Sequence, residues 1–294
     1  MNTFGSILTA MITPFTETGE VDYQAAVDIA HYLLANGSDG LVVAGTTGEG
    51  AVMSAGEKIR LFETIVDAVG TDIPVIANTG SYDTSESVKL TAAAEKAGVT
   101  AVMAVAPYYN KPTQEGCYRH FAAIASAVSL PVVLYNVPGR TSLNLAPETV
   151  VRLAKEFPNI VAVKEASGNL VQISQIAGSM PDGFMIYSGD DSLTLPILAV
   201  GGAGVISVSS HIIGTQMNEM VRAFKSGEIT KAQHLHYYLL PFMQGMFFTS
   251  SPIPVKEAMN LIGQPGGHFR LPLVHANEKE MNIIQNLLAK YQLL

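Results

Sequence analysis

The chain has 294 residues, of which 48% are hydrophobic and 14% are charged. This composition excludes a disordered chain, which cannot bury enough apolar surface to offset its conformational entropy. There are 17 basic and 25 acidic residues, giving a net charge of −8, and the basic residues form no cluster. No nucleic acid is therefore expected as a partner. The single cysteine, Cys117, excludes an intramolecular disulfide and fits a reducing compartment.

Export and membrane insertion are also not expected. Lys58 is the first cationic residue, so residues 1–15 lack the positive start of a secretory signal. The longest apolar run, Leu195–Val208, is too short and too rich in glycine to span a bilayer. The sequence therefore predicts a cytoplasmic protein without a membrane partner.

Short apolar runs recur along the chain, each followed by turn residues. Runs that are apolar throughout are typical of parallel strands buried on both faces. The predicted strands are Ile7–Thr13, Gly40–Ala44, Pro74–Ala77, Ala101–Ala106, Pro131–Tyr135, Ile160–Lys164, Met185–Ser188 and Gly204–Val208.

Segments with helical periodicity separate these strands. The predicted helices are Tyr23–Asn36, Ala55–Val69, Ser85–Ala97, Thr113–Val128, Pro147–Glu156, Leu170–Ser179, Leu193–Val200 and Ile212–Ser226. Strand and helix alternate throughout, which predicts an α/β fold of the (β/α)8 or TIM barrel type.

Only helical spacing remains after residue 226. Pro254 is expected to open one helix, and Glu278–Tyr291 to form another. Four apolar residues ahead of them are interpreted as helix core, namely Met243, Met246, Phe247 and Phe248. We therefore divide the chain into a catalytic barrel, residues 1–226, and a C-terminal helical appendage, residues 227–294.

Lys164 is the strongest candidate for chemistry, because active sites of such barrels lie at the C-terminal ends of the strands. It follows the apolar run Ile160–Val163. A buried ammonium has a lowered pKa, and a neutral amine attacks carbonyl groups to form a Schiff base. The alternative is a strand-end lysine that reaches out to solvent.

Other polar residues follow neighbouring strands. Tyr135 ends the strand next to that of Lys164 and is either a proton shuttle or a rim aromatic. Thr46 and Thr47 lie in a glycine-rich loop that either binds a carboxylate or is a plain tight turn. Arg140 either clamps a carboxylate or forms a surface ion pair.

A metal site is not expected. Of the seven histidines only His234 and His236 are close in sequence, and on a helix they would face different directions. A metal-dependent aldol reaction therefore has no evident ligands, whereas an amine-dependent one has Lys164 as its candidate.

Six segments, in order along the chain, resemble motifs of the 4-hydroxy-tetrahydrodipicolinate synthase (dihydrodipicolinate synthase) family, in the superfamily of N-acetylneuraminate lyase. The match extends over essentially the whole chain. The segments are Gly45–Glu49, Pro107–Pro112, Tyr135–Thr141, Val163–Ala166, Ser188–Asp191 and Gly204–Val208.

The resemblance implies a lyase that condenses pyruvate with L-aspartate 4-semialdehyde, in lysine and diaminopimelate biosynthesis, without a cofactor. Lys164 would form an imine with pyruvate, which then becomes an enamine. Tyr135 would relay protons, and Thr46 would link it to Tyr109, which in this family reaches in from a neighbouring subunit. The resemblance therefore also implies an oligomer, a homotetramer built as a dimer of dimers.

The same resemblance implies the substrate-binding residues. Thr47 would hold the pyruvate carboxylate, and Arg140 the carboxylate of the second substrate. Gly189 and Ile206 would line the site through backbone groups. The arginine favours the synthase over its runner-up, a pyruvate-dependent sugar-acid aldolase or lyase of the same superfamily. A non-catalytic barrel that serves as a scaffold is the third reading.

One departure concerns the family's effector site. Lysine-sensitive members carry histidines in the stretch that here reads Gly50–Lys58 and has none. A vestigial effector site would then consist of four positions, namely Tyr108, Glu86, Tyr82 and Ala51. Tyr82 stands in place of an asparagine. We expect weak or absent inhibition by lysine.

Overall fold

The computed structural model, which describes residues 4–294, contains a closed barrel of eight parallel strands. Each strand pairs with the next in sequence, and β8 returns to pair with β1. The strands are β1 (Ile7–Ala10), β2 (Gly40–Val43), β3 (Val75–Asn78), β4 (Ala101–Val105), β5 (Val132–Asn136), β6 (Ile160–Glu165), β7 (Met185–Ser188) and β8 (Gly204–Ser207). The predicted (β/α)8 barrel is confirmed.

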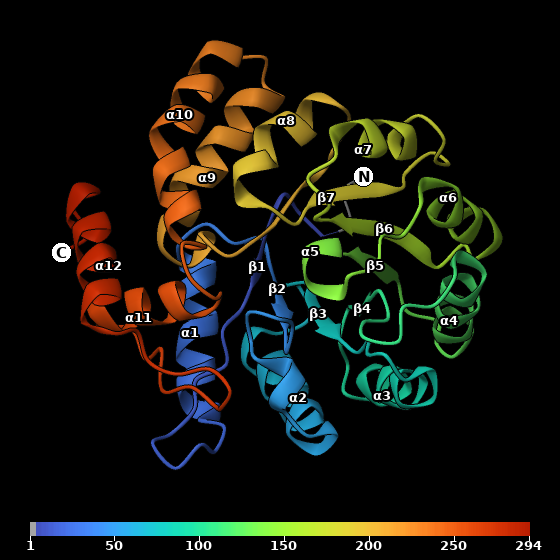
Figure 1. The fold of residues 1–294 in the computed structure, drawn as a ribbon, viewed down its shortest axis with the longest axis horizontal. Helices are drawn as coiled ribbons and strands as arrows, with labels where there is room; N and C mark the ends of the chain where they lie inside the picture. Colours follow the sequence, from blue (N-terminus) through green and yellow to red (C-terminus); the bar gives the residue numbers. More distant parts are fainter. Residues whose placement is uncertain (1–3) are drawn as a thin grey trace.

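Helices surround the barrel, and the short helix α5 lies over it instead, as Figure 1 shows. They are α1 (Tyr23–Ala35), α2 (Ala55–Val69), α3 (Thr84–Lys96), α4 (Gln114–Ser126), α5 (Pro138–Thr141), α6 (Pro147–Glu156), α7 (Leu170–Ala177), α8 (Thr194–Ala199) and α9 (Ser210–Lys225). Two 3-10 turns, η1 (Gly50–Val52) and η2 (Asp191–Leu193), follow β2 and β7. No helix of the described chain is long and apolar enough to cross a membrane.

Side chains at the strand ends and caps explain where the predicted bounds differ. The bounds of α2, α6 and β7 agree with the prediction, and the others shift by a few residues. β1 was predicted to reach Thr13 but ends at Ala10, because the N–H of Ile12 donates to His211 Nε2 (3.1 Å) rather than to a strand. The predicted start of α4 at Thr113 is its N-cap, whose hydroxyl accepts from the N–H of Gly116.

Two helices, α5 and α10 (Ile229–Gly245), were not predicted with bounds from the sequence. The short helix α5 is a single turn, which is too little for periodicity to reveal. The helix α10 had no predicted bounds, and it contains Pro241 in its interior. Periodicity is a weak guide to a helix that carries such an interruption.

Alternation along the strands divides the core into two layers. Odd positions of β1 and β8 and even positions of β5 pack outward against the surrounding helices, as with Ile7, Val205 and Val132. The neighbouring positions point into the barrel, where Leu8 and Val133 belong to a separate buried cluster. The same alternation in β6 sends Val163 outward and directs Lys164 inward, next to Tyr135.

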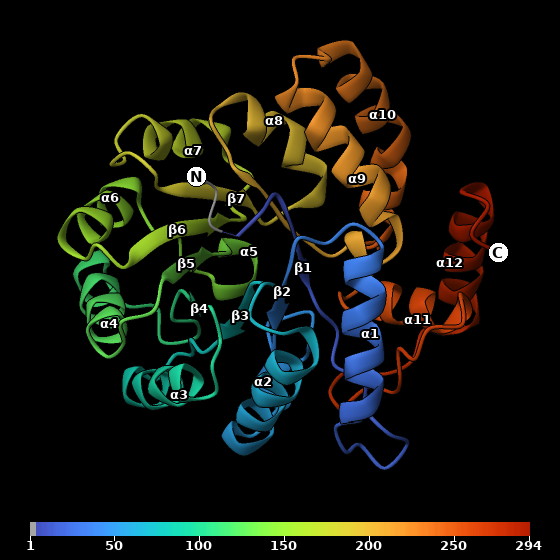
Figure 2. The same cartoon turned by 180° about the vertical axis from the view of Figure 1, so that it is seen from behind.

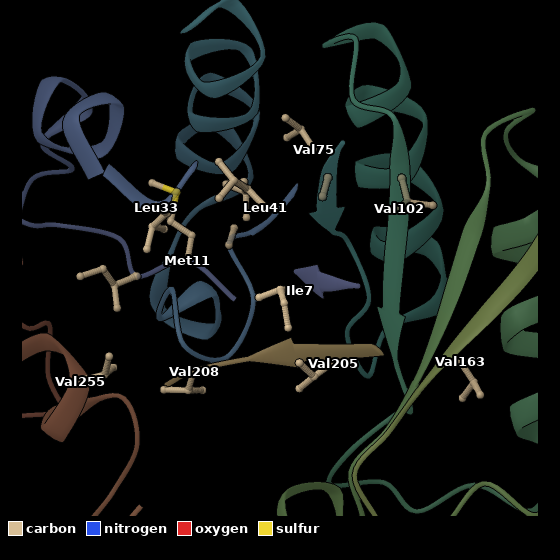
Figure 3. Close-up of a cluster of buried hydrophobic side chains, with 14 of the residues drawn as sticks. Ile7, Met11, Leu33, Leu41, Val75, Val102, Val163, Val205, Val208 and Val255 are labelled. Carbon is tan, nitrogen blue, oxygen red and sulfur yellow. The ribbon is translucent and has the colours of Figure 1, made fainter. Parts of the chain in front are cut away.

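The C-terminal helices lie beside this barrel. α10 runs along α9, while α11 (Ile253–Leu261) and α12 (Glu278–Lys290) lie outside the ring near α1 (Figures 1 and 2). Val255 of α11 belongs to the same buried cluster as Leu33 and Met11 (Figure 3). The C-terminal segment therefore shares its core with the barrel, and a division at residue 227 stays a prediction.

Candidate active site

Lys164 and Tyr135 face each other inside the barrel mouth. The register of β5 and β6 makes them Cα partners. The Lys164 Nζ lies 4.4 Å from the centroid of the Tyr135 ring. Both side chains are buried, with 6% and 5% of their surface exposed. The reading of Lys164 as a lysine that reaches solvent is therefore wrong, and so is the reading of Tyr135 as a rim aromatic.

The Lys164 amine has little to stabilise its charged form. Burial lowers its pKa from the usual 10.5 to about 8, and the Arg140 charge acts in the same direction, while the Asp191 carboxylate opposes them. Among residues 4–294 the Lys164 side chain forms no ion pair. A fraction of the amine is thus unprotonated near neutral pH, as a nucleophile requires.

The glycine at position 189 lets the chain after β7 pass close to the Lys164 side chain. A Cβ on Gly189 would lie 2.6 Å from the Cβ of Ala166 and 3.2 Å from Lys164 Cε. Only glycine lets the chain after β7 approach so closely. The backbone of Gly189 is therefore in contact distance of the reactive side chain, and its N–H donates to the Glu165 carbonyl (2.8 Å).

The loop after β2 forms a tight turn over residues 45–50, here called the threonine turn. Its backbone closes through Glu49 N–H to Thr46 O (3.1 Å) and Gly50 N–H to Gly45 O (3.0 Å). Glu49 adopts the left-handed conformation with φ 52°. This turn directs Thr46 and Thr47 toward the barrel mouth. Burial raises the pKa of Tyr135, and the Arg140 charge and a hydrogen bond with Thr46 partly offset that rise.

A cavity of about 330 Å³ joins these groups, and we call it the reaction cavity. Six of the predicted site residues line it: Lys164, Tyr135, Thr46, Thr47, Arg140 and Gly189. Arg140, in α5, also donates from Nη2 to the Ser251 carbonyl (3.4 Å). The structure therefore brings together an amine, a phenol, two hydroxyls and a guanidinium.

Two predicted residues do not line the reaction cavity. Ile206 packs in the barrel interior in the cluster that holds Tyr135, and Val208 lines the cavity in its place. Tyr109 is 89% exposed and adopts φ 70°. Within one chain it lies outside the reaction cavity.

Other lining residues were not predicted. Asp190 and Ser192 follow β7, and the former lies in a segment that the resemblance had already marked. Met243, Gln244 and Phe247 come from the end of α10 and the turn after it, so the C-terminal segment forms one wall. No motif or spacing pointed to them, and only the packing of α10 along α9 brings them there.

The interpretation of four apolar residues as helix core was half wrong. Met243 and Met246 are buried, whereas Phe247 and Phe248 are 42% and 37% exposed. They lie beyond the last residue of α10, where the chain leaves the helix. Phe247 faces the reaction cavity instead.

A second cavity of about 460 Å³ adjoins the first and shares Thr46, Val137 and Arg140 with it. Tyr82 and Tyr108 stack edge to face within its wall, 5.3 Å apart. The four expected vestigial effector positions all line it: Tyr108, Glu86, Tyr82 and Ala51. Lys58 lines it too, in the stretch where histidines were missing, and burial lowers the pKa of Lys58.

The described residues contain no set of side chains that could bind a metal ion. Among residues 4–294 no group of three or more histidine, cysteine or acidic side chains is placed to hold a metal ion. The groups that line the reaction cavity are instead those of covalent amine catalysis.

A (β/α)8 barrel with a buried amine at the end of β6 defines the class, a Schiff-base lyase of the class I aldolase type. Comparison with known proteins is more specific. The model of the dihydrodipicolinate synthetase family matches residues 3–291, and the chain belongs to this family.

Its relatives match over nearly their whole length. The 4-hydroxy-tetrahydrodipicolinate synthase of Bacillus subtilis is 56% identical over 94% of this chain and 96% of its own. That of Desulforamulus reducens is 53% identical over 99% and 98%. The structure of the Cyanidioschyzon merolae enzyme with lysine bound has a TM-score of 0.98 and 43% identity, and covers 100% of both chains.

Proposed function

We propose that this protein condenses pyruvate with L-aspartate 4-semialdehyde to 4-hydroxy-tetrahydrodipicolinate, a step of lysine and diaminopimelate biosynthesis. The observation that carries the proposal is the buried Lys164 amine, 4.4 Å from the Tyr135 ring and with a pKa of about 8. The family and the names of its full-length relatives support the same reaction.

The first half of the reaction uses Lys164 and Tyr135. The Lys164 amine adds to the C2 carbonyl of pyruvate, and water leaves to give a protonated imine. This imine withdraws electrons, so C3 loses a proton and an enamine forms. Tyr135 carries protons between these steps, because its phenol lies over the same amine.

The second half makes the new carbon–carbon bond. The enamine C3 attacks the aldehyde carbon of the second substrate, whose oxygen takes up a proton. The amine of that substrate then attacks the imine carbon and displaces Lys164, which closes a six-membered ring. Lys164 leaves as a free amine, so the cycle consumes no cofactor.

Both substrates carry a carboxylate, and the cavity offers a donor for each. Thr47, 5% exposed, holds the pyruvate carboxylate through its hydroxyl and backbone. Arg140 binds the carboxylate of the second substrate from the outer rim. Gly189 supplies backbone groups to the site.

Tyr109 completes the site from a second subunit. Its exposure of 89% leaves the side chain free to enter a neighbouring chain, where Thr46 joins it to Tyr135. We propose a homotetramer built as a dimer of dimers, in the cytoplasm. Light scattering gives the mass of the assembly, and Tyr109→Phe lowers kcat without changing that mass.

The second cavity is a vestigial effector site under this proposal. Lys58 lines the cavity that a cationic effector would enter. Like charges repel in a partly buried cavity. We propose that lysine inhibits this enzyme weakly or not at all.

The test is a comparison of acceptors with purified protein and pyruvate. Fast consumption of L-aspartate 4-semialdehyde, with the cyclic product identified by mass, supports the synthase. Cleavage or synthesis of a sugar acid, with no reaction of the semialdehyde, would instead favour the sugar-acid lyase, which shares the Lys164 imine. Arg140→Ala raises KM for the semialdehyde far more than KM for pyruvate.

A further inference from the structure

A fully buried ion pair joins the threonine turn to the C-terminal segment. The Lys256 Nζ lies 2.6 Å from the Glu49 Oε1, and the two side chains are 0% and 1% exposed. Glu49 ends the segment that carries Thr46 and Thr47, whereas Lys256 lies in α11, 207 residues later. Neither residue lines the reaction cavity.

The Lys256 ammonium is completely enclosed. It donates a second hydrogen bond to the His268 carbonyl. The rings of Phe15 and Phe269 lie against it, with centroids at 4.6 and 4.8 Å. A buried charge is tolerated only with partners of this quality, and apolar residues of equal volume would be no less stable. Stability alone therefore gives no reason for placing charges here.

The second oxygen of Glu49 is bound by the same C-terminal segment. Glu49 Oε2 accepts the backbone N–H of Arg270 (3.1 Å). The Arg270 guanidinium then donates to the carbonyls of Gly19 (2.7 Å) and Val52 (3.0 Å) and pairs with Glu57. Residues 268–270 thus hold the Glu49 carboxylate and the backbone just after the threonine turn.

The conformation of Glu49 needs this support. Its φ of 52° lies in the left-handed region, which a residue with a side chain adopts at a cost and keeps where its surroundings fix it. Its N–H closes the turn on the Thr46 carbonyl (3.1 Å). Anchoring the Glu49 carboxylate therefore fixes the orientation of Thr46 and Thr47, three and two residues before it in the same turn.

We propose that Glu49 and Lys256 are positioning residues for Thr46 and Thr47, so that the C-terminal segment sets the geometry of the pyruvate site. This inference rests on the proposed function, in which Thr47 holds the pyruvate carboxylate. The ion pair fixes the orientation of the Glu49 side chain, whereas an apolar contact would hold it without orienting it. Its loss alters pyruvate binding even in a chain of unchanged stability.

The test separates geometry from stability with the double variant Glu49→Gln/Lys256→Met. Removing both charges leaves no unpaired ion in the core, so the melting temperature stays near that of the wild type. The pyruvate concentration that half-saturates borohydride trapping rises by about 10- to 100-fold, the cost of a misplacement near 1 Å. The matched control is Glu219→Gln/Lys231→Met, an exposed pair 2.8 Å apart, which leaves half-saturation unchanged.

Glu49→Asp keeps the charge but shortens the side chain by one methylene, and it decides the matter if the double variant does not fold. It is expected to raise half-saturation by pyruvate, with a smaller effect on the trapping rate at saturation. Wild-type half-saturation in either folded variant overturns the inference and leaves the proposed function intact. A wild-type protein that forms no pyruvate adduct overturns both.

Discussion

Two lysines of this protein are buried to a similar degree, but the groups around their ammonium groups differ. Lys256 is 0% exposed and has a carboxylate, a carbonyl and two aromatic rings around its ammonium. Lys164 is 6% exposed and has one aromatic ring, with no ion pair among the described residues. Burial lowers the pKa of both ammonium groups, but only the Lys256 ammonium has a carboxylate bound to it.

The difference follows from where each lysine sits in the fold. Lys164 is the penultimate residue of β6 and lines a cavity, so its surroundings include space for a substrate. Lys256 lies on a helix that packs against the barrel, and protein atoms fill its surroundings. Substituting each lysine by methionine, which keeps the volume and removes the charge, tests whether the two lysines differ in this way.

The largest effect is expected for Lys164→Met. Without the amine no imine forms, and kcat/KM falls by more than about 10⁴-fold, the scale of losing a covalent nucleophile. The free energy of unfolding stays the same or rises, because a desolvated charge disappears. Product formation and urea unfolding measure the two effects, and substantial residual activity would contradict the account.

Lys256→Met is expected to lower the free energy of unfolding rather than to remove the chemistry. The Glu49 carboxylate is left buried and unpaired, which costs about 3–5 kcal/mol of unfolding free energy. Urea unfolding at one protein concentration measures it, with Lys231→Met as a control that changes stability by no more than about 1 kcal/mol. A stable Lys256→Met protein would show that the pair adds nothing to the fold.

The pH dependence of imine formation distinguishes the buried Lys164 from an ordinary exposed lysine. Only the unprotonated Lys164 amine reacts, and its pKa is lowered to about 8. The rate therefore rises with pH by about tenfold between pH 7 and 9 and then levels off, since each unit below the pKa is a tenfold loss of free amine. A rate that still climbs above pH 10 would indicate an ordinary exposed lysine.

The smallest effect concerns Lys58 in the second cavity. Millimolar lysine should lower the rate of the wild type by less than about twofold, because the Lys58 ammonium opposes a second cation. The variant Lys58→Met removes that charge, and lysine should then inhibit more strongly. Strong inhibition of the unaltered enzyme would refute this explanation.

Local patterns in the sequence predicted the barrel and the two central residues of the site, Lys164 and Tyr135. Continuous apolar runs identify buried parallel strands, and alternation within β6 then directs Lys164 inward beside Tyr135. The wall formed by Met243, Gln244 and Phe247 could not be predicted, because it depends on how α10 packs along α9. The Glu49–Lys256 pair spans 207 residues and likewise leaves no local signal.

The most direct test of the account is borohydride reduction in the presence of pyruvate, followed by intact mass and peptide mapping. We expect a single reduced pyruvate adduct, on Lys164, with Lys256 unmodified. Folded protein without an adduct, or with one on another lysine, would contradict the claim that Lys164 carries the chemistry.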